Sequence, residues 1–70
     1  MSTEIEQLKQ RIDDSGLNGI PTAQVRDDYE PAGDLMMMGL LDSAGYVQRK
    51  ISITTFEQEW RIFRRDFAPF

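Results

Sequence analysis

The strongest hydrophobic pattern lies in the last third of the chain. Four aromatic residues recur there at i, i+4, i+7 and i+11, the spacing of one face of an α-helix: Phe56, Trp60, Phe63 and Phe67. Thr55 with Gln58 fits a capping box at the start of such a helix. We therefore predict an amphipathic helix over residues 56–66. Aromatic side chains carry a large apolar area, so this face must be covered by the rest of the chain or by a partner.

The first thirty residues predict two shorter helices. Ser2 and Thr3 can each cap a helix that ends at Gly16. Its apolar residues form a narrow stripe: Ile5, Leu8 and Ile12. Thr22 can cap a second helix that runs to Tyr29, because Pro31 and Gly33 then end it.

A third helix and a strand follow. Asp34 can cap a helix over residues 35–42 that is apolar nearly all round, the pattern of a helix buried on several sides. Its three consecutive methionines cannot all face one core, so at least one should be exposed or lie at an interface. From Tyr46 to Ile53 the period becomes two, which predicts one strand. That strand needs a hydrogen-bonding partner, either residues 16–20 or its counterpart in a second copy.

These elements predict one domain over residues 1–70, an α+β, mainly helical fold. It has three short helices, one β-strand and a C-terminal amphipathic helix. Three helices followed by a strand resemble, in order only, the opening of a winged-helix DNA-binding domain. The lone strand and the aromatic stripe both favour a homodimer.

The amino-acid composition excludes several kinds of catalytic and metal-binding site. The 70 residues contain no Cys and no His, which excludes disulfides, zinc-finger patterns and the commonest pairs of nucleophile and base. No apolar run approaches the roughly 18 residues of a membrane-spanning helix. We expect a cytoplasmic protein that does not associate with membranes. We also expect that it is not an enzyme and has no catalytic residue, and that it binds neither a cofactor nor a metal.

Acidic residues form two clusters, at residues 13–14 and 27–30. Asp14 begins a loose likeness to a calcium-binding EF-hand loop, but Val25 stands where a bidentate Glu is needed. We therefore interpret these acids as solvated helix ends and turns rather than as ligands.

Charge is divided unevenly along the chain. The net charge is −4, with −6 on residues 1–45 and +2 on residues 46–70. The predicted third helix has no Arg, Lys, Asn or Gln to contact a base edge, so we do not expect sequence-specific DNA binding through it. Two nucleic-acid alternatives stay open: a regulator of winged-helix-like architecture that contacts phosphate, and an acidic nucleic-acid mimic.

The function that we favour is a protein–protein interaction domain, an adaptor or inhibitor that acts as a homodimer on an unidentified protein partner. Arg61, Arg64 and Arg65 would share one side of the predicted C-terminal helix, or simply form a solvated face. Trp and Arg dominate interface hot spots. The predicted partner or dimer interface is therefore Phe56, Trp60, Phe63, Phe67, Arg61, Arg64 and Arg65. Autonomous chains of this kind are frequent among accessory proteins of phages and other mobile elements.

Overall fold

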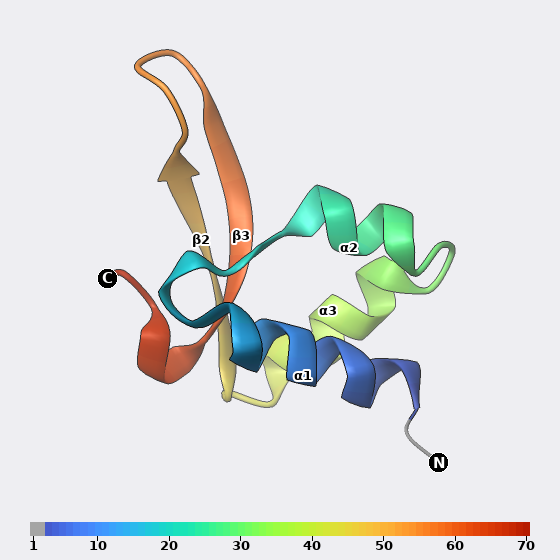
Figure 1. Ribbon diagram of the computed structural model, residues 1–70. Coiled ribbons are helices and arrows are strands. Elements are labelled where there is room, and N and C mark those ends of the chain that lie inside the picture. The colour runs from blue at the N-terminus through green and yellow to red at the C-terminus, as the bar shows by residue number, and fades with distance from the viewer. Residues whose placement is uncertain (1–2) are drawn as a thin grey trace.

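The computed structural model describes residues 3–70, in which three α-helices pack on one face of a three-stranded antiparallel sheet (Figure 1). The elements, in chain order, are α1 (Glu4–Ser15), η1 (Gly16–Asn18), β1 (Ile20–Pro21), α2 (Thr22–Asp28), α3 (Gly33–Asp42), β2 (Tyr46–Ser52), β3 (Gln58–Arg64) and η2 (Arg65–Phe67). The strand order in the sheet is β1-β3-β2, so the last strand along the chain lies in the middle.

Helix α1 confirms the first predicted helix. The Thr3 hydroxyl accepts a hydrogen bond from the backbone N–H of Glu6 at 3.3 Å, and the helix ends where Gly16 takes a φ of 56°. The other predicted cap, Ser2, lies outside the described residues. Leu8 and Ile12 are fully buried, which fixes the apolar stripe of α1 against the sheet.

Helices α2 and α3 form near their predicted positions, but not with the predicted caps. Pro21 precedes α2, and the hydroxyl of Thr22 donates to the carbonyl of Trp60 in β3 at 3.3 Å. Helix α3 begins at Gly33, and Asp34 accepts a hydrogen bond from Arg26 at 2.8 Å. Both polar side chains join neighbouring elements to each other instead of closing the end of their own helix.

The predicted strand over residues 46–53 is confirmed as β2, but its partner within the chain is not residues 16–20. It pairs with β3 in a hairpin, in the register that places Val47 opposite Phe63. The short strand β1 pairs with the other edge of β3, with Ile20 opposite Ile62. The backbone of β2 therefore finds its partner within the chain, which removes one of the two reasons for expecting a homodimer.

The predicted C-terminal helix is wrong, and with it the predicted fold of one β-strand and a C-terminal helix. Residues 58–64 are the central strand of an α+β fold with three helices and three strands among the described residues. Ile62 and Phe63 are both fully buried although they are consecutive. Side chains that follow each other in a strand point to opposite faces. Ile62 joins the core beneath the helices, while Phe63 lies against Gly19.

A turn explains the apparent capping signal. The hydroxyl of Thr54 accepts hydrogen bonds from the backbone N–H groups of Phe56 and Glu57, at 3.3 and 3.1 Å. The backbone N–H of Ile53 donates to the carbonyl of Glu57 at 2.9 Å. Threonine can close a turn with the same kind of bond that caps a helix. The predicted capping box of Thr55 with Gln58 is therefore wrong, because the neighbouring Thr54 makes these bonds and closes the hairpin.

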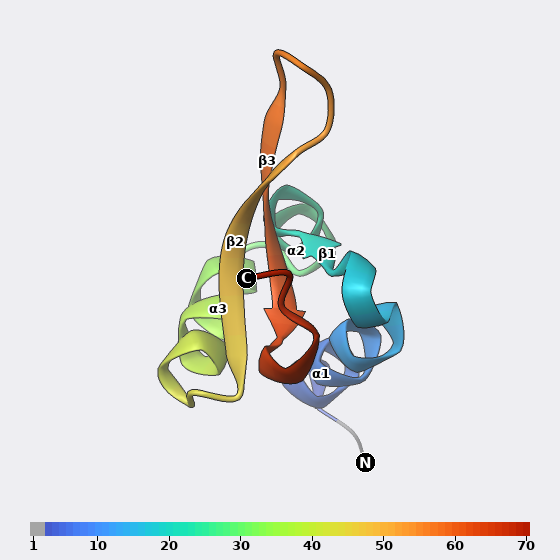
Figure 2. The ribbon, with the colours of Figure 1, turned by 90° about the vertical axis from the view of Figure 1, so that its left-hand side faces the viewer.

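Near the helices, the sheet is covered on both faces. On the helix side the core consists of Leu8, Ile12, Ile20, Val25, Met37, Leu40 and Ile62. On the other side, the segment after β3 returns across the hairpin, as Figure 2 shows. There Arg49 donates to the carbonyl of Phe70 at 2.9 Å, and its guanidinium lies 5.8 Å from the centroid of the Phe70 ring.

Tyr46 joins the hairpin to the first helix. Its hydroxyl donates to a carboxylate oxygen of Asp13 at 3.3 Å, and the side chain packs against the core. Burial raises the pKa of the Tyr46 phenol, and the negative charge of Asp13 raises it further. The folded protein therefore favours the neutral phenol.

This pKa shift predicts a loss of stability in alkaline solution. A group whose pKa is higher in the folded state stabilises that state below the unfolded pKa, about 10 for tyrosine. The contribution is lost as pH rises through the folded pKa. We expect Tyr46→Phe to be less stable than the wild type by about 1 kcal/mol at neutral pH, through the lost hydrogen bond. The difference should shrink above about pH 10 in urea unfolding. A difference that stays constant would contradict the assignment.

Candidate functional site

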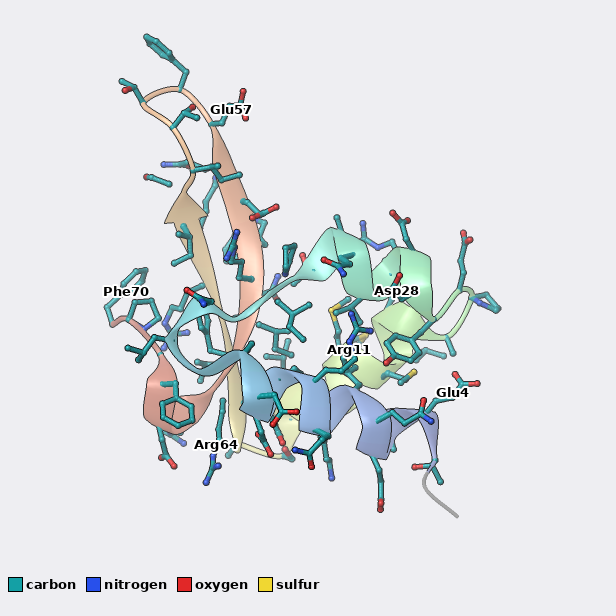
Figure 3. All side chains as sticks on the ribbon, viewed as in Figure 1. Glu4, Arg11, Asp28, Glu57, Arg64 and Phe70 are labelled. Atoms are coloured by element: carbon teal, nitrogen blue, oxygen red, sulfur yellow. The ribbon has the colours of Figure 1, made fainter. Side chains whose placement is uncertain are left out.

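The hairpin of β2 and β3 extends well beyond the helices (Figures 1 and 2). The molecule is accordingly elongated, with extents of 42 × 25 × 20 Å. Residues 53–57 form the hairpin tip, and Figure 3 shows Glu57 there, far from the helices. The tip carries two exposed apolar side chains, Ile53 and Phe56.

The predicted aromatic interface is divided among different surroundings. Phe56 at the hairpin tip is 95% exposed, and Trp60 on β3 is 48% exposed. Phe63 is only 1% exposed and belongs to the core. Phe67, in η2, is half-buried, and the guanidinium of Arg64 lies 5.7 Å from the centroid of its ring. Of the four, only Phe56 and Trp60 offer substantial apolar surface.

The three predicted interface arginines do not share one side, because they belong to a strand and to the 3₁₀ turn after it. Arg61 donates to Glu59 at 2.8 Å and to the carbonyl of Asn18 at 2.9 Å. Arg64 points to the opposite face of the strand and lies 3.4 Å from a carboxylate oxygen of Asp66. Arg65 donates to the carbonyl of Ala44 at 3.2 Å. Each of the three arginines therefore binds another group of the same chain, and the three do not form one cationic surface.

The remaining arginines are also engaged. Arg11 donates to the Tyr29 hydroxyl and to Asp28, at 3.1 and 3.0 Å, and Figure 3 shows Arg11 and Asp28 on facing elements. The hydrogen bond to Tyr29 raises the pKa of Arg11, and Asp28 adds to this effect. Arg26 pairs with Asp34, whose hydrogen bond raises the pKa of Arg26. These pairs hold α1, α2 and α3 together, and they also occupy two of the acids that a nucleic-acid mimic would present.

The outer side of α3 is the main exposed apolar surface on the helices. Leu35 is 72% exposed and Met38 is 59% exposed, whereas Met37 and Leu40 are buried. At 100° per residue, Leu35 and Asp42 project away from the core, with Met38 on their flank. The exposure of Met38 confirms that the methionine triplet does not lie wholly in the core. Leu35, by contrast, was missed, because a helix that is apolar all round does not reveal which side is covered.

A hollow of about 320 Å³ lies between α3 and the hairpin. We call it the α3 hollow, and its lining residues come from α2, α3 and β2: Thr22, Arg26, Asp34, Met37, Met38, Leu41 and Gln48. Methionine side chains are flexible and polarisable, so such a lining adapts to apolar groups of different shapes. The paired charges of Arg26 and Asp34 belong to the same lining.

The α3 hollow continues onto the hairpin. Gln48 lines the hollow, and Lys50 projects from the same side of β2, two residues further towards the tip. Lys50 is opposite Trp60 in the register, and its ammonium lies 5.8 Å from the centroid of the indole ring. The helix-side face of the hairpin therefore leads from the hollow to a half-exposed indole.

Other parts of the surface are weaker candidates for a binding site. A second hollow, of about 440 Å³, is lined by Glu6, Gln7, Gln10 and Arg11, which all belong to α1. It is a depression along one helix and brings no distant residues together. Among residues 3–70, no three carboxylates are grouped so that they could hold a metal ion. None of the helices in that range is both long and apolar enough to cross a membrane.

Comparison with known proteins gives no relative. No protein-family model, no curated protein and no solved structure matches this chain. The surfaces described above are therefore the basis for a functional assignment.

Proposed function

We propose that this protein is a small, non-enzymatic protein–protein interaction domain of the cytoplasm, an adaptor or inhibitor, that docks a protein partner on the outer side of α3. One observation carries the proposal: Leu35 and Met38 are 72% and 59% exposed on a helix whose other side is buried at Gly33, Met37 and Leu40. Exposed apolar patches of this kind are typical of interaction sites.

The electrostatics also favour a protein partner. A nucleic-acid-binding surface needs cationic groups that can neutralise phosphates. All six arginines instead contact carboxylates, carbonyl groups or aromatic rings within the chain. The exposed end of α3 also carries Asp42, which would repel phosphate.

A matched pair of substitutions tests the proposal. Leu35→Asp should reduce capture of the partner at least tenfold, because it places a charge at the centre of the docking surface. Leu17→Asp is the control, since Leu17 is similarly exposed, at 75%, but lies in η1. Quantitative mass spectrometry of captured proteins compares the two variants. Equal capture by both, with the fold intact by circular dichroism, would refute the assignment to α3.

A second candidate function is nucleic-acid regulation, and the order of elements favours it. Helix, strand, helix, helix and hairpin is the order found in winged-helix domains, where a helix–turn–helix places its second helix in the major groove. Here α3 would be that helix, and it has no Arg, Lys, Asn or Gln. Fluorescence anisotropy with random duplex DNA at about 50 mM salt distinguishes the two functions. Salt-sensitive binding at micromolar protein would favour the regulator.

A further inference from the structure

The exposed side of α3 is a stripe that is two helical turns long. Its four residues follow the spacing i, i+3, i+4 and i+7, and all of them are exposed: Leu35, Met38, Gly39 and Asp42. At about 1.5 Å per residue, the stripe is about 10 Å long. Leu35 and Met38 supply its apolar surface, whereas Gly39 and Asp42 are both unfavourable at their positions in a helix.

No contact within the described residues requires a glycine at position 39. A glycine in the interior of a helix destabilises that helix relative to alanine. Gly33, the other glycine of α3, has a packing reason, because a Cβ there would lie 2.8 Å from the Cα of Arg26. A Cβ on Gly39 would meet no atom of another element within 4 Å. The space above Gly39 therefore faces solvent, and the backbone of another molecule can approach closely there.

Asp42 lies at the end of α3 where a negative charge is unfavourable. The C-terminal end of a helix carries a partial negative charge, which favours Lys and Arg in the last turn. The last turn of α3 has no basic residue. Among residues 3–70, no ion pair involves the Asp42 carboxylate. A cation supplied by a partner would compensate both the carboxylate and the end of the helix.

We infer that the partner docks an amphipathic helix across α3 at Gly39, with its apolar side on Leu35 and Met38 and a Lys or Arg at Asp42. The inference rests on the proposed function, which it deepens by identifying the chemistry of the partner. A small residue at the crossing point lets two helices approach closely, so that the side chains around it interlock. Residues that break a local rule without compensation inside the fold are expected at functional sites. A basic amphipathic helix accounts for Gly39 and Asp42 together.

The backbone and the charges of this surface both favour such a partner. The N–H and carbonyl groups in the middle of α3 bind each other, so an extended strand would find no hydrogen-bonding partner there, whereas a helix satisfies its own backbone. Residues 22–42 carry one basic and five acidic residues. Asp28 and Asp34 are paired with arginines, which leaves three acids without an ion pair among residues 3–70: Asp27, Glu30 and Asp42. This surface attracts a basic partner, and charge opposes an acidic one or a second copy of α3.

Selection of a phage-displayed library of random peptides on the full chain tests the chemistry of the partner. Peptides of about 16 residues are long enough to form a helix. We expect the enriched peptides to carry apolar residues at i, i+3 or i+4 and i+7, with Lys and Arg in excess over Asp and Glu. The most enriched peptide should become helical by circular dichroism when it binds, and its affinity should fall several-fold as salt is raised. Failure to enrich any peptide, or enrichment of acidic or non-helical peptides, would overturn the inference.

Two substitutions in the stripe should change stability and peptide binding in opposite directions. Gly39→Leu should raise the midpoint of thermal unfolding by several degrees, because leucine is a better helix former and its side chain meets open space. It should weaken binding of the enriched peptide at least tenfold, because the new side chain keeps the partner helix away from α3. Asp42→Lys should also stabilise the chain, weaken binding several-fold and reduce the salt dependence. Unchanged or tighter binding by Gly39→Leu would show that the surface is merely apolar and would refute the crossing at Gly39.

Matched controls make the same changes elsewhere. Gln7→Leu adds a leucine at an exposed position of α1, and Glu57→Lys reverses a charge at the hairpin tip, so both should leave binding unchanged. Leu35→Asp separates this inference from the proposed function. If Leu35→Asp abolishes capture of the partner while Gly39→Leu does not, docking on α3 stands and the helix across Gly39 is refuted. If Leu35→Asp leaves capture unchanged as well, the proposed function itself is refuted.

Discussion

Phe63→Ala is expected to lower the free energy of unfolding by about 3–5 kcal/mol, the usual cost of removing a buried phenylalanine. Phe63 is 1% exposed on the face of β3 that lies away from the helices. The core of a domain of about 70 residues rarely supplies more than about 3–5 kcal/mol of net stability, so the variant should be largely unfolded at 37 °C. Thermal unfolding followed by circular dichroism measures the effect.

The matched control is Phe56→Ala. Phe56 is 95% exposed at the hairpin tip, so its removal should change the stability of the monomer by less than about 0.5 kcal/mol. Both residues belonged to the same face of the helix predicted from sequence, where the two substitutions would have similar effects. If Phe63→Ala does not fold at all, Phe63→Leu provides a milder measurement. Equal effects at the two positions would contradict the hairpin.

Local signals in the sequence identified the N-terminal half of the fold. Thr3 and Gly16 bound α1 because each acts within its own helix, through a capping hydroxyl and a positive φ. The alternation from Tyr46 also identified β2. These patterns depend on contacts a few residues apart, so they could be predicted without knowledge of the tertiary structure.

The C-terminal strand could not be predicted in this way, because its determinants are distant in sequence. The spacing of the aromatic residues matches one face of a helix, although the segment is a strand. Ile62 and Phe63 point to opposite faces of that strand, and both are buried because each face is covered there. One face is covered by the helices and the other by the region around Gly19. A central strand has apolar residues on both sides and loses the simple alternation. The sequence did contain one signal for a second strand, because the backbone of the predicted strand needed a hydrogen-bonding partner.

The predicted interface residues differ from the candidate site in the structure for the same reason, because residues 58–64 form a strand and not a helix. Trp60 was predicted as an interface residue and is half-exposed, whereas Phe63 was predicted beside it and lies in the core. A helical arrangement would have placed Arg61 and Arg64 side by side, but a strand separates them onto opposite faces. The α3 hollow required three elements to come together, and no local pattern reports such a site.

Gly19→Ala is expected to destabilise the fold by more than about 2 kcal/mol, through two separate effects. Gly19 has φ 68° and ψ −175°, a conformation that costs other residues about 1–3 kcal/mol. A Cβ there would also lie 2.6 Å from the ring of Phe63 and 2.9 Å from the carbonyl oxygen of Ile62. Overpacking of this kind typically costs a further 1–3 kcal/mol.

Gly16→Ala separates these two effects. Gly16 has a φ of 56°, but an added Cβ would meet no atom within 4 Å. It should therefore show the backbone cost alone, and chemical denaturation of both variants gives the cost of the contact by difference. A double-mutant cycle with Phe63→Ala checks the origin of that difference. Once the ring is absent, the penalty of Gly19→Ala should fall towards that of Gly16→Ala, limited by the remaining contact with the Ile62 carbonyl. An unchanged penalty would show that the ring does not pack over Gly19, and that the outer face of β3 is closed in another way.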